Sequence, residues 1–128
     1  MILYHPPGET AMNTLNMHPQ WTQTQALVVA HEFELMVLPH NGHIALGGSC
    51  LHKGFSTKDL DLFLYAHKPP FTEDQLNAIF NALPAYGITI IRSPNNAVDD
   101  LGEPLYWRKV AQLQDSDHRR IDLFILNG

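Results

Sequence analysis

The chain has 128 residues, of which 45% are hydrophobic and 16% are charged, a composition that suits one domain with a modest core and excludes a disordered chain. The formal net charge of −5 at pH 7 argues against a protein that binds long nucleic acids through a basic face. Cys50 is the single cysteine, which excludes an internal disulfide and a multi-cysteine metal site.

The first 21 residues are irregular in sequence, with prolines and glycine among scattered polar residues. We expect residues 1–21 to form an arm that is ordered only where something holds it, with residues 1–4 as a short edge strand. The remaining residues, 22–128, are predicted to form a single domain.

A helix is predicted over residues 22–38. Thr22 and Gln25 form a capping box at its start. The residues 39–42, Pro-His-Asn-Gly, end it, and a short buried strand is predicted over 43–46. The predicted apolar face of the helix consists of Leu27, Ala30, Phe33, Leu35 and Val37.

The clearest strand in the sequence covers residues 60–66 and ends before Pro69. Thr72 and Gln75 form a second capping box, and the helix that follows closes at Pro84 and Gly87. Its apolar residues recur with helical spacing at Leu76, Ile79, Phe80 and Leu83.

The last third of the chain reads as strands. Strands are predicted over 88–92, 105–113 and 119–126, with a polar loop over 93–104 and a turn over 115–118. The order of elements predicts an α+β (mixed α/β) fold, with a mixed sheet of four to five strands backed by helices. Because two helices cannot cover both faces of such a sheet, one face is expected to be open to a ligand or a partner.

Three aspartates are candidates for chemistry. Asp59 and Asp61 alternate with leucines, so in a strand both point to one face, about 6–7 Å apart. Asp122 lies inside another apolar strand, where an isolated carboxylate is costly to bury. Hard divalent cations take oxygen ligands from such carboxylates and from substrate phosphates, so a two-metal site is one interpretation. The simpler alternatives are a solvated strand face for Asp59 and Asp61, and a rim ion pair with Arg119 or Arg120 for Asp122.

A glycine turn precedes the aspartate pair. Gly47, Gly48 and Ser49 follow the short predicted strand, and the absence of a Cβ lets the backbone approach a phosphate chain. If a helical turn begins at Ser49, its N–H groups and hydroxyl point at an anion, and Lys53 lies one turn further on. A tight turn without a ligand is compatible with the same residues.

The pattern Gly47-Gly48-Ser49, nine residues, Asp59-Leu60-Asp61, with a later Asp122, resembles the signature of the DNA polymerase β-like nucleotidyltransferase superfamily. The resemblance covers residues 22–126 and implies the minimal catalytic core of that fold. It implies transfer of a nucleoside monophosphate from an NTP, with ATP as the expected donor, to a protein, an RNA end or a small molecule, with release of pyrophosphate. Mg²⁺ or Mn²⁺ is the implied cofactor.

The resemblance also implies roles for individual residues. Asp59, Asp61 and Asp122 would be the catalytic, metal-binding residues, and Gly47, Gly48 and Ser49 would hold the terminal phosphates. Further candidates for nucleotide binding, with an ordinary surface role as the alternative, are Lys53, Lys58, Arg119 and Arg120.

The chain departs from larger superfamily members after Asp122, where many carry a helical domain. Base and acceptor choice must then come from the N-terminal arm, the 93–104 loop or another subunit, so a protein partner or a homo-oligomer is expected. A long nucleic acid is a less favoured partner because of the net charge. No apolar run reaches about 18 residues and no secretory signal is visible, so we expect a cytoplasmic protein that does not enter a membrane.

Two other functions stay open at this point. The chain is alternatively a non-catalytic module that keeps the fold and binds a nucleotide or a protein, although such modules usually lose an acid or the Gly-Ser pair. It is also alternatively an unrelated interaction protein whose match to the pattern is accidental. The eight histidines do not show the spacing of a helical zinc site, and no base can be named that would activate Cys50.

Overall fold

The structure is a computed structural model that describes residues 20–56, 58–98, 101 and 104–126. Its elements follow one another along the chain as β1 (Trp21–Thr22), α2 (Gln23–Val37), η1 (Leu38–His40), β2 (Gly42–Gly47), α3 (Gly48–Lys53), β3 (Phe55–Ser56), β4 (Leu60–Ala66), α4 (Glu73–Ala82), η2 (Leu83–Tyr86), β5 (Thr89–Val98), β6 (Pro104–Gln114) and β7 (Arg120–Leu126), where η marks a 3₁₀ helix.

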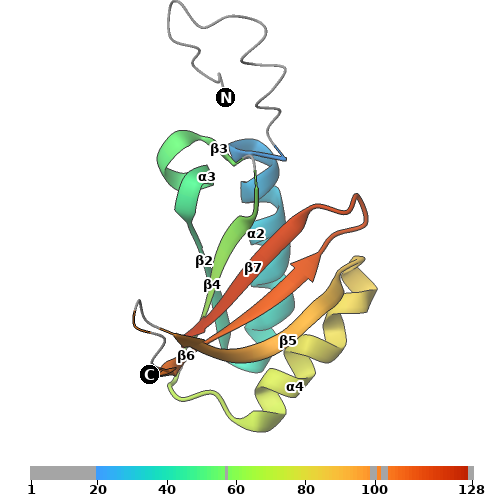
Figure 1. The fold of residues 1–128 in the computed structure, drawn as a ribbon. Coiled ribbons are helices and arrows are strands. Elements are labelled where there is room, and N and C mark those ends of the chain that lie inside the picture. The colour runs from blue at the N-terminus through green and yellow to red at the C-terminus, as the bar shows by residue number, and fades with distance from the viewer. Residues whose placement is uncertain (1–19, 57, 99–100, 102–103, 127–128) are drawn as a thin grey trace, which may run out of the picture.

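Five of the strands form one mixed sheet in the order β2-β4-β7-β6-β5 (Figure 1). All neighbouring pairs are antiparallel except β4 and β7, which run parallel at the centre. β1 and β3 form a separate two-stranded sheet. The predicted α+β class and the mixed sheet of up to five strands are therefore confirmed.

Helices α2 and α4 pack on the same side of the sheet (Figure 1). Both begin where the sequence places them, because the two capping boxes form. The backbone N–H of Gln25 donates to the Thr22 hydroxyl at 3.2 Å, and the backbone N–H of Thr22 donates to the side-chain oxygen of Gln25 at 3.0 Å. Thr72 and Gln75 make the same pair of bonds at 3.1 and 2.9 Å.

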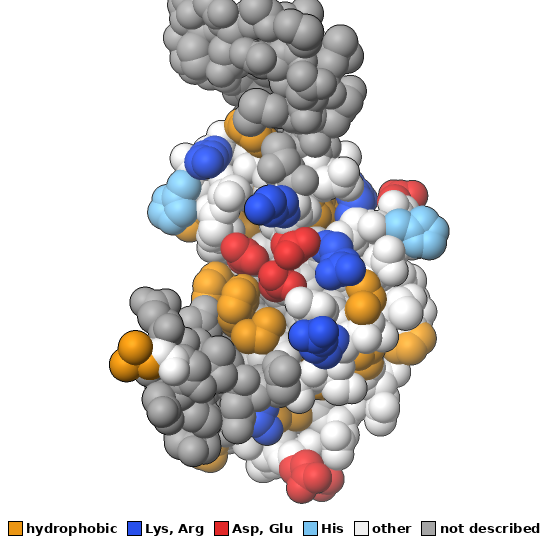
Figure 2. Space-filling view, viewed as in Figure 1, with side chains coloured by type: hydrophobic (Ala, Val, Ile, Leu, Met, Phe, Trp, Pro, Cys, Tyr) orange, Lys and Arg blue, Asp and Glu red, His pale blue; other side chains and the backbone are white. Residues whose placement is uncertain are grey.

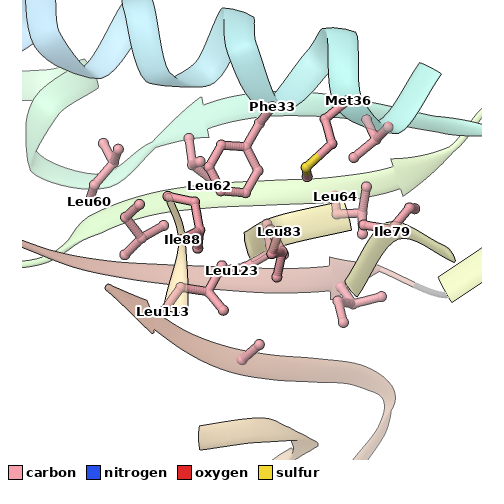
Figure 3. Packing of buried hydrophobic residues seen from close by; sticks show 14 of the residues in the cluster. Phe33, Met36, Leu60, Leu62, Leu64, Ile79, Leu83, Ile88, Leu113 and Leu123 are labelled. Carbon is pink, nitrogen blue, oxygen red and sulfur yellow. The ribbon is translucent and has the colours of Figure 1, made fainter. Parts of the chain in front are cut away.

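The core lies between these helices and the sheet (Figure 3). Strand alternation sends every second residue of β4 and β7 into it, while the residues between them face the opposite side of the sheet. The buried core side chains drawn and labelled in Figure 3 are Phe33, Met36, Leu60, Leu62, Leu64, Ile79, Leu83, Ile88, Leu113 and Leu123.

The predicted apolar face of the first helix is wrong for two residues. Leu27 and Leu35 are each 54% exposed, whereas Ala26, Phe33 and Met36 are buried. At 3.6 residues per turn, Leu27 and Leu35 share one side of α2 and Phe33 lies on another. Apolar residues occupy both sides of this helix, so the periodicity of the sequence alone does not identify its buried side.

The predicted loop over 93–104 is also wrong in extent. β5 continues to Val98 and β6 begins at Pro104, with register shifts between them after Ile90, Arg92 and Asn96. Such irregularities are common at the edge of a sheet, where they admit polar residues and proline. The polar composition of residues 93–98 is therefore that of an irregular edge strand.

Trp21, which the sequence assigned to the irregular arm, is part of the folded domain. Trp21 is completely buried, and its backbone pairs with that of Ser56 in the small sheet. The predicted edge strand over residues 1–4 lies outside the described residues, and the assignment of residues 1–19 to an arm stays a prediction.

Candidate active site

The sheet brings two of the three candidate aspartates together. Asp61 in β4 and Asp122 in β7 are direct Cα partners in the parallel ladder, so their side chains leave neighbouring strands on the same face. This is the face that α2 and α4 do not cover. Figure 2 shows that face, with acidic side chains gathered at its centre and basic side chains around them.

Asp59 completes the cluster from the residue before β4. Burial, the charge of Asp59, a hydrogen bond that protonated Asp122 makes with Asp59, and the charge of Asp61 together raise the pKa of Asp122 from 3.8 to about 6. The positive charge of Arg120 opposes this shift. A carboxylate whose pKa is raised by two like charges belongs to a cluster that repels itself when fully ionised.

The glycine turn lies directly against the carboxylates. Gly47 pairs with Asp61 across the β2–β4 ladder. Gly48 has a φ of +67°, and a Cβ added there would overlap the Asp61 carboxylate. Glycine is therefore required at position 48 both for its backbone conformation and for the close approach of the turn to Asp61.

The other residues predicted to bind the nucleotide form two groups, those with exposed side chains and Arg119, whose side chain is bound elsewhere. Ser49 is exposed in the first turn of α3, and Lys53 is exposed at the end of that helix; Lys58 is exposed one residue before Asp59. Arg120 is exposed and acts electrostatically on Asp122.

Arg119 is engaged elsewhere. Its Nε donates to Asp115 Oδ2 at 2.8 Å, and its guanidinium lies over the Trp21 ring, 4.2 Å from the centroid. The structure therefore gives Arg119 a structural role in holding the β6–β7 turn, and it is not among the groups that act on Asp122.

Register adds two polar residues that the sequence did not single out. Gln112 in β6 is the Cα partner of Asp122, and Arg92 in β5 is the Cα partner of Gln112. Gly47, Asp61, Asp122, Gln112 and Arg92 thus form one line across five strands, which we call the carboxylate row. Only strand pairing reveals this line, because its members are scattered along the sequence.

The fit of a divalent cation can be judged from the donor atoms. Asp122 Oδ1 is buried and has no hydrogen-bond partner among the described residues, so one oxygen at the centre of the cluster lacks the partner that burial normally demands. Carboxylate oxygens are the ligands that Mg²⁺ and Mn²⁺ prefer. As the side chains stand, however, no group of three His, Cys, Asp or Glu residues in the described part of the chain is arranged to hold a metal ion. The residues fit such an ion in chemistry.

Cys50 lies near the site, and a hollow in the surface lies apart from it. Cys50 is buried, and burial together with the charge of Asp61 raises the pKa of its thiol to about 11, which keeps it protonated at neutral pH. A hollow of about 240 Å³ lies between α2, η2 and the β6–β7 turn, where Asp115 and Arg119 form part of its wall. Because its lining residues do not include the aspartate cluster, it is not part of this site.

No sequence-family profile and no curated protein sequence matches this chain. Solved structures do resemble it in fold. Cid1, described for its RNA terminal uridylyl transferase activity, superposes with a TM-score of 0.58 at 12% identity over 80% of this chain and 31% of its own. A cytoplasmic RNA terminal U-transferase gives 0.55 at 10% identity, over 80% of this chain and 28% of its own.

A third structure, the Cid1 poly(U) polymerase with Mg and 3′-dATP bound, gives a TM-score of 0.54 at 12% identity, over 80% of this chain and 30% of its own. This chain thus spans less than a third of the length of each neighbour. The similarity shows that this chain shares the nucleotidyltransferase-like fold of these structures.

None of the helices in the described residues is long and apolar enough to cross a membrane.

Proposed function

We propose that this chain is a metal-dependent nucleotidyltransferase, which transfers a nucleoside monophosphate from an NTP to an acceptor and releases pyrophosphate. The observation that carries the proposal is the in-register pairing of Asp61 with Asp122, with Asp59 close enough to raise the pKa of Asp122. Like charges are brought together at a cost in stability, and the fold holds them beside a glycine turn.

Each residue of the site has a proposed part in this reaction. Asp59, Asp61 and Asp122 would hold Mg²⁺ or Mn²⁺, which when bound supplies positive charge against the triphosphate and lowers the pKa of the attacking hydroxyl. Gly47 and Gly48 allow the backbone to approach the terminal phosphates. Side chains that would bind or neutralise those phosphates are Ser49, Lys53, Lys58, Arg92 and Arg120.

The transfer itself is a single displacement at phosphorus. The acceptor oxygen forms a bond to the α-phosphorus, and the bond from that phosphorus to the oxygen bridging the β-phosphate breaks. The proton of the acceptor hydroxyl passes to the carboxylate cluster, at Asp122. Positioning and electrostatic stabilisation supply most of the rate in such reactions, so the rigid β4–β7 pair is a suitable support.

The identity of the substrates is part of the proposal. ATP is the first donor to test, and a protein, an RNA end or a small molecule is the acceptor. UTP and its analogues belong in the same test, because a Cid1 neighbour was solved with the UTP analogue UMPNPP. A protein partner or a second copy would supply the acceptor surface, and we expect the protein in the cytoplasm.

The test is incubation with each of the four α-labelled NTPs, with Mg²⁺ or Mn²⁺, in a lysate of the source cell. We expect label on one class of acceptor. Asp59→Ala and Asp61→Ala should abolish transfer, and Asp122→Ala should lose transfer while keeping part of the NTP binding. Ser49→Ala should weaken binding about tenfold, because it removes one hydrogen bond to a charged group.

Asp74→Ala is the matched control, since Asp74 is an exposed carboxylate in the first turn of α4. It should leave transfer unchanged. NTP binding without labelling of any acceptor would favour the non-catalytic module. A protein that neither binds an NTP nor labels an acceptor with either metal would refute the proposed function.

A further inference from the structure

Two phenylalanines lie next to the carboxylate row on the same face of the sheet. Phe63 in β4 and Phe124 in β7 are Cα partners, and their rings stack with centroids 5.0 Å apart and planes inclined by 17°. Each follows a site aspartate, Asp61 or Asp122, by two residues, a distance of about 6–7 Å along the strand. We call this ring pair the phenylalanine shelf.

The residues on either side of the shelf are small or apolar. Ala45 in β2 is the Cα partner of Phe63, and Val110 in β6 is the Cα partner of Phe124. Both phenylalanines are partly accessible, and Figure 2 shows hydrophobic side chains beside the acidic cluster on this face. An apolar surface thus continues directly from the carboxylates.

The glycine turn is shaped around the shelf as well as around Asp61. A Cβ at Gly47 would overlap the ring of Phe63. The glycine that would admit the phosphates therefore also leaves room for the first ring, so the shelf and the proposed phosphate site share one wall.

We propose that the phenylalanine shelf binds a nucleobase by stacking, with the phosphates of the same or the adjoining nucleotide held at the carboxylate row. This inference rests on the proposed function. The two rings stack on each other, and the part of the pair that stays accessible is an aromatic surface against which the π-face of any base can pack. Because Ala45, Phe63, Phe124 and Val110 carry no polar side-chain atoms, the shelf holds a base without reading its hydrogen-bonding edge.

The experiment compares two phosphate ligands that differ in whether they carry a base. Isothermal calorimetry measures the affinity of the full-length protein for magnesium tripolyphosphate and for the magnesium complex of a non-hydrolysable NTP analogue. The variants are Phe63→Leu, Phe124→Leu and Phe63→Trp. Tyr86→Leu is the control, because Tyr86 is an aromatic residue, 48% exposed, in η2 away from the carboxylate row.

We expect the wild type and Tyr86→Leu to bind the analogue about tenfold more tightly than tripolyphosphate, a ratio that corresponds to about 1.4 kcal/mol. Phe63→Leu and Phe124→Leu should lose that ratio and keep the affinity for tripolyphosphate, while Phe63→Trp should retain it. If Phe63→Leu disturbs the glycine turn, its tripolyphosphate affinity will fall, and Phe124→Leu then decides.

A second titration identifies which nucleotide carries the base. A dinucleoside monophosphate with a free 3′ hydroxyl is added to the protein saturated with the NTP analogue. Weakened dinucleotide binding in Phe124→Leu, with an unchanged analogue ratio, assigns the shelf to the acceptor base; the reverse assigns it to the donor base. If Phe124→Leu alters neither ligand, the shelf inference is overturned and the proposed function stands. If tripolyphosphate does not bind at all, the proposed function fails first.

Discussion

At the scale of single residues, Asp122 shows how the site acts on stability. Its pKa is raised from 3.8 to about 6, so between these values the folded protein holds a proton that the unfolded chain releases. The free energy of unfolding therefore falls as the pH rises through this window. At neutral pH the full shift corresponds to at most about 3 kcal/mol, and partial access to solvent reduces that figure.

Replacing this carboxylate should stabilise the metal-free protein. Asp122→Asn should raise the melting temperature in EDTA by a few degrees at pH 7.5, because the ionised cluster loses one charge. The gain should shrink toward pH 4.5, where Asp122 is already protonated in the wild type. Thermal unfolding across this pH range measures both effects. Glu32→Gln, at an exposed position of α2, is the control; a loss of stability in Asp122→Asn at pH 7.5 would contradict this prediction.

Gly48 provides a second prediction at this scale, with a matched control in the same chain. Gly48 and Gly87 both have positive φ, but a Cβ at Gly87 has its nearest contact at 3.9 Å, whereas one at Gly48 meets Asp61. Both alanine variants should lose about 1–2 kcal/mol from backbone strain. Only Gly48→Ala should also abolish stabilisation by a magnesium–NTP complex. Urea unfolding with and without the ligand measures this, and equal ligand responses would contradict it.

At the scale of elements, a carboxylate of α2 ties the helix to the edge strand β2. Glu34 Oε1 accepts from the Ile44 amide at 2.6 Å, and Oε2 lies 2.8 Å from His43 Nδ1. Burial raises the pKa of Glu34, but the hydrogen bonds from His43 and Ile44 and the nearby histidines outweigh it and lower the pKa below 4.5. The bond to Ile44 blocks part of an exposed strand edge.

Removing that charge should therefore destabilise the protein in a pH-dependent way. Because the folded pKa is lowered, the contribution of Glu34 is complete above pH 4.5 and is lost as the pH falls through its folded pKa. Glu34→Gln should cost about 1 kcal/mol at pH 7, and the difference should vanish at acid pH. Glu32→Gln, at an exposed position of the same helix, is the control. A difference that stayed constant down to pH 3 would be inconsistent with this assignment.

At the scale of the whole molecule, Trp21 joins the beginning of the domain to its end. Its indole Nε1 donates to the carbonyl of Arg120 at 2.9 Å, across a sequence separation of 99 residues, and Arg119 covers its ring. Arg120 begins β7, the strand that carries Asp122. The residue that the sequence assigned to an irregular arm thus holds the strand of the third carboxylate.

Trp21→Phe tests this link, because it keeps an aromatic ring and removes the N–H donor. The Arg120 carbonyl then loses a partner, which should cost about 1–3 kcal/mol in urea unfolding. Amide hydrogen exchange should speed up at the start of β7 more than in α4. Equal changes in both elements would mean that Trp21 contributes only general packing.

The sequence was informative for several local signals, although the periodicity of the first helix did not identify its buried side. The two capping boxes, the alternation around Asp61 and the glycine turn each depend on neighbouring residues, and their helices and strand form as expected. The phenylalanine shelf and the partnership of Arg92 with Gln112 depend on strand register, which single residues do not encode. The contacts of Arg119 with Asp115 and Trp21 are fixed by a turn and by a distant segment, so the sequence did not predict them.

The parallel pairing of β4 with β7 has a consequence for how the protein is made. β4 lies between β2 and β7 in the sheet, so a growing chain that has not yet reached residue 126 leaves one edge of β4 without a neighbour. Contacts this distant in sequence form slowly, and an unpaired apolar strand is a template for aggregation. We therefore expect the domain to fold only after synthesis through β7, and nascent chains halted near residue 118 to depend on chaperones.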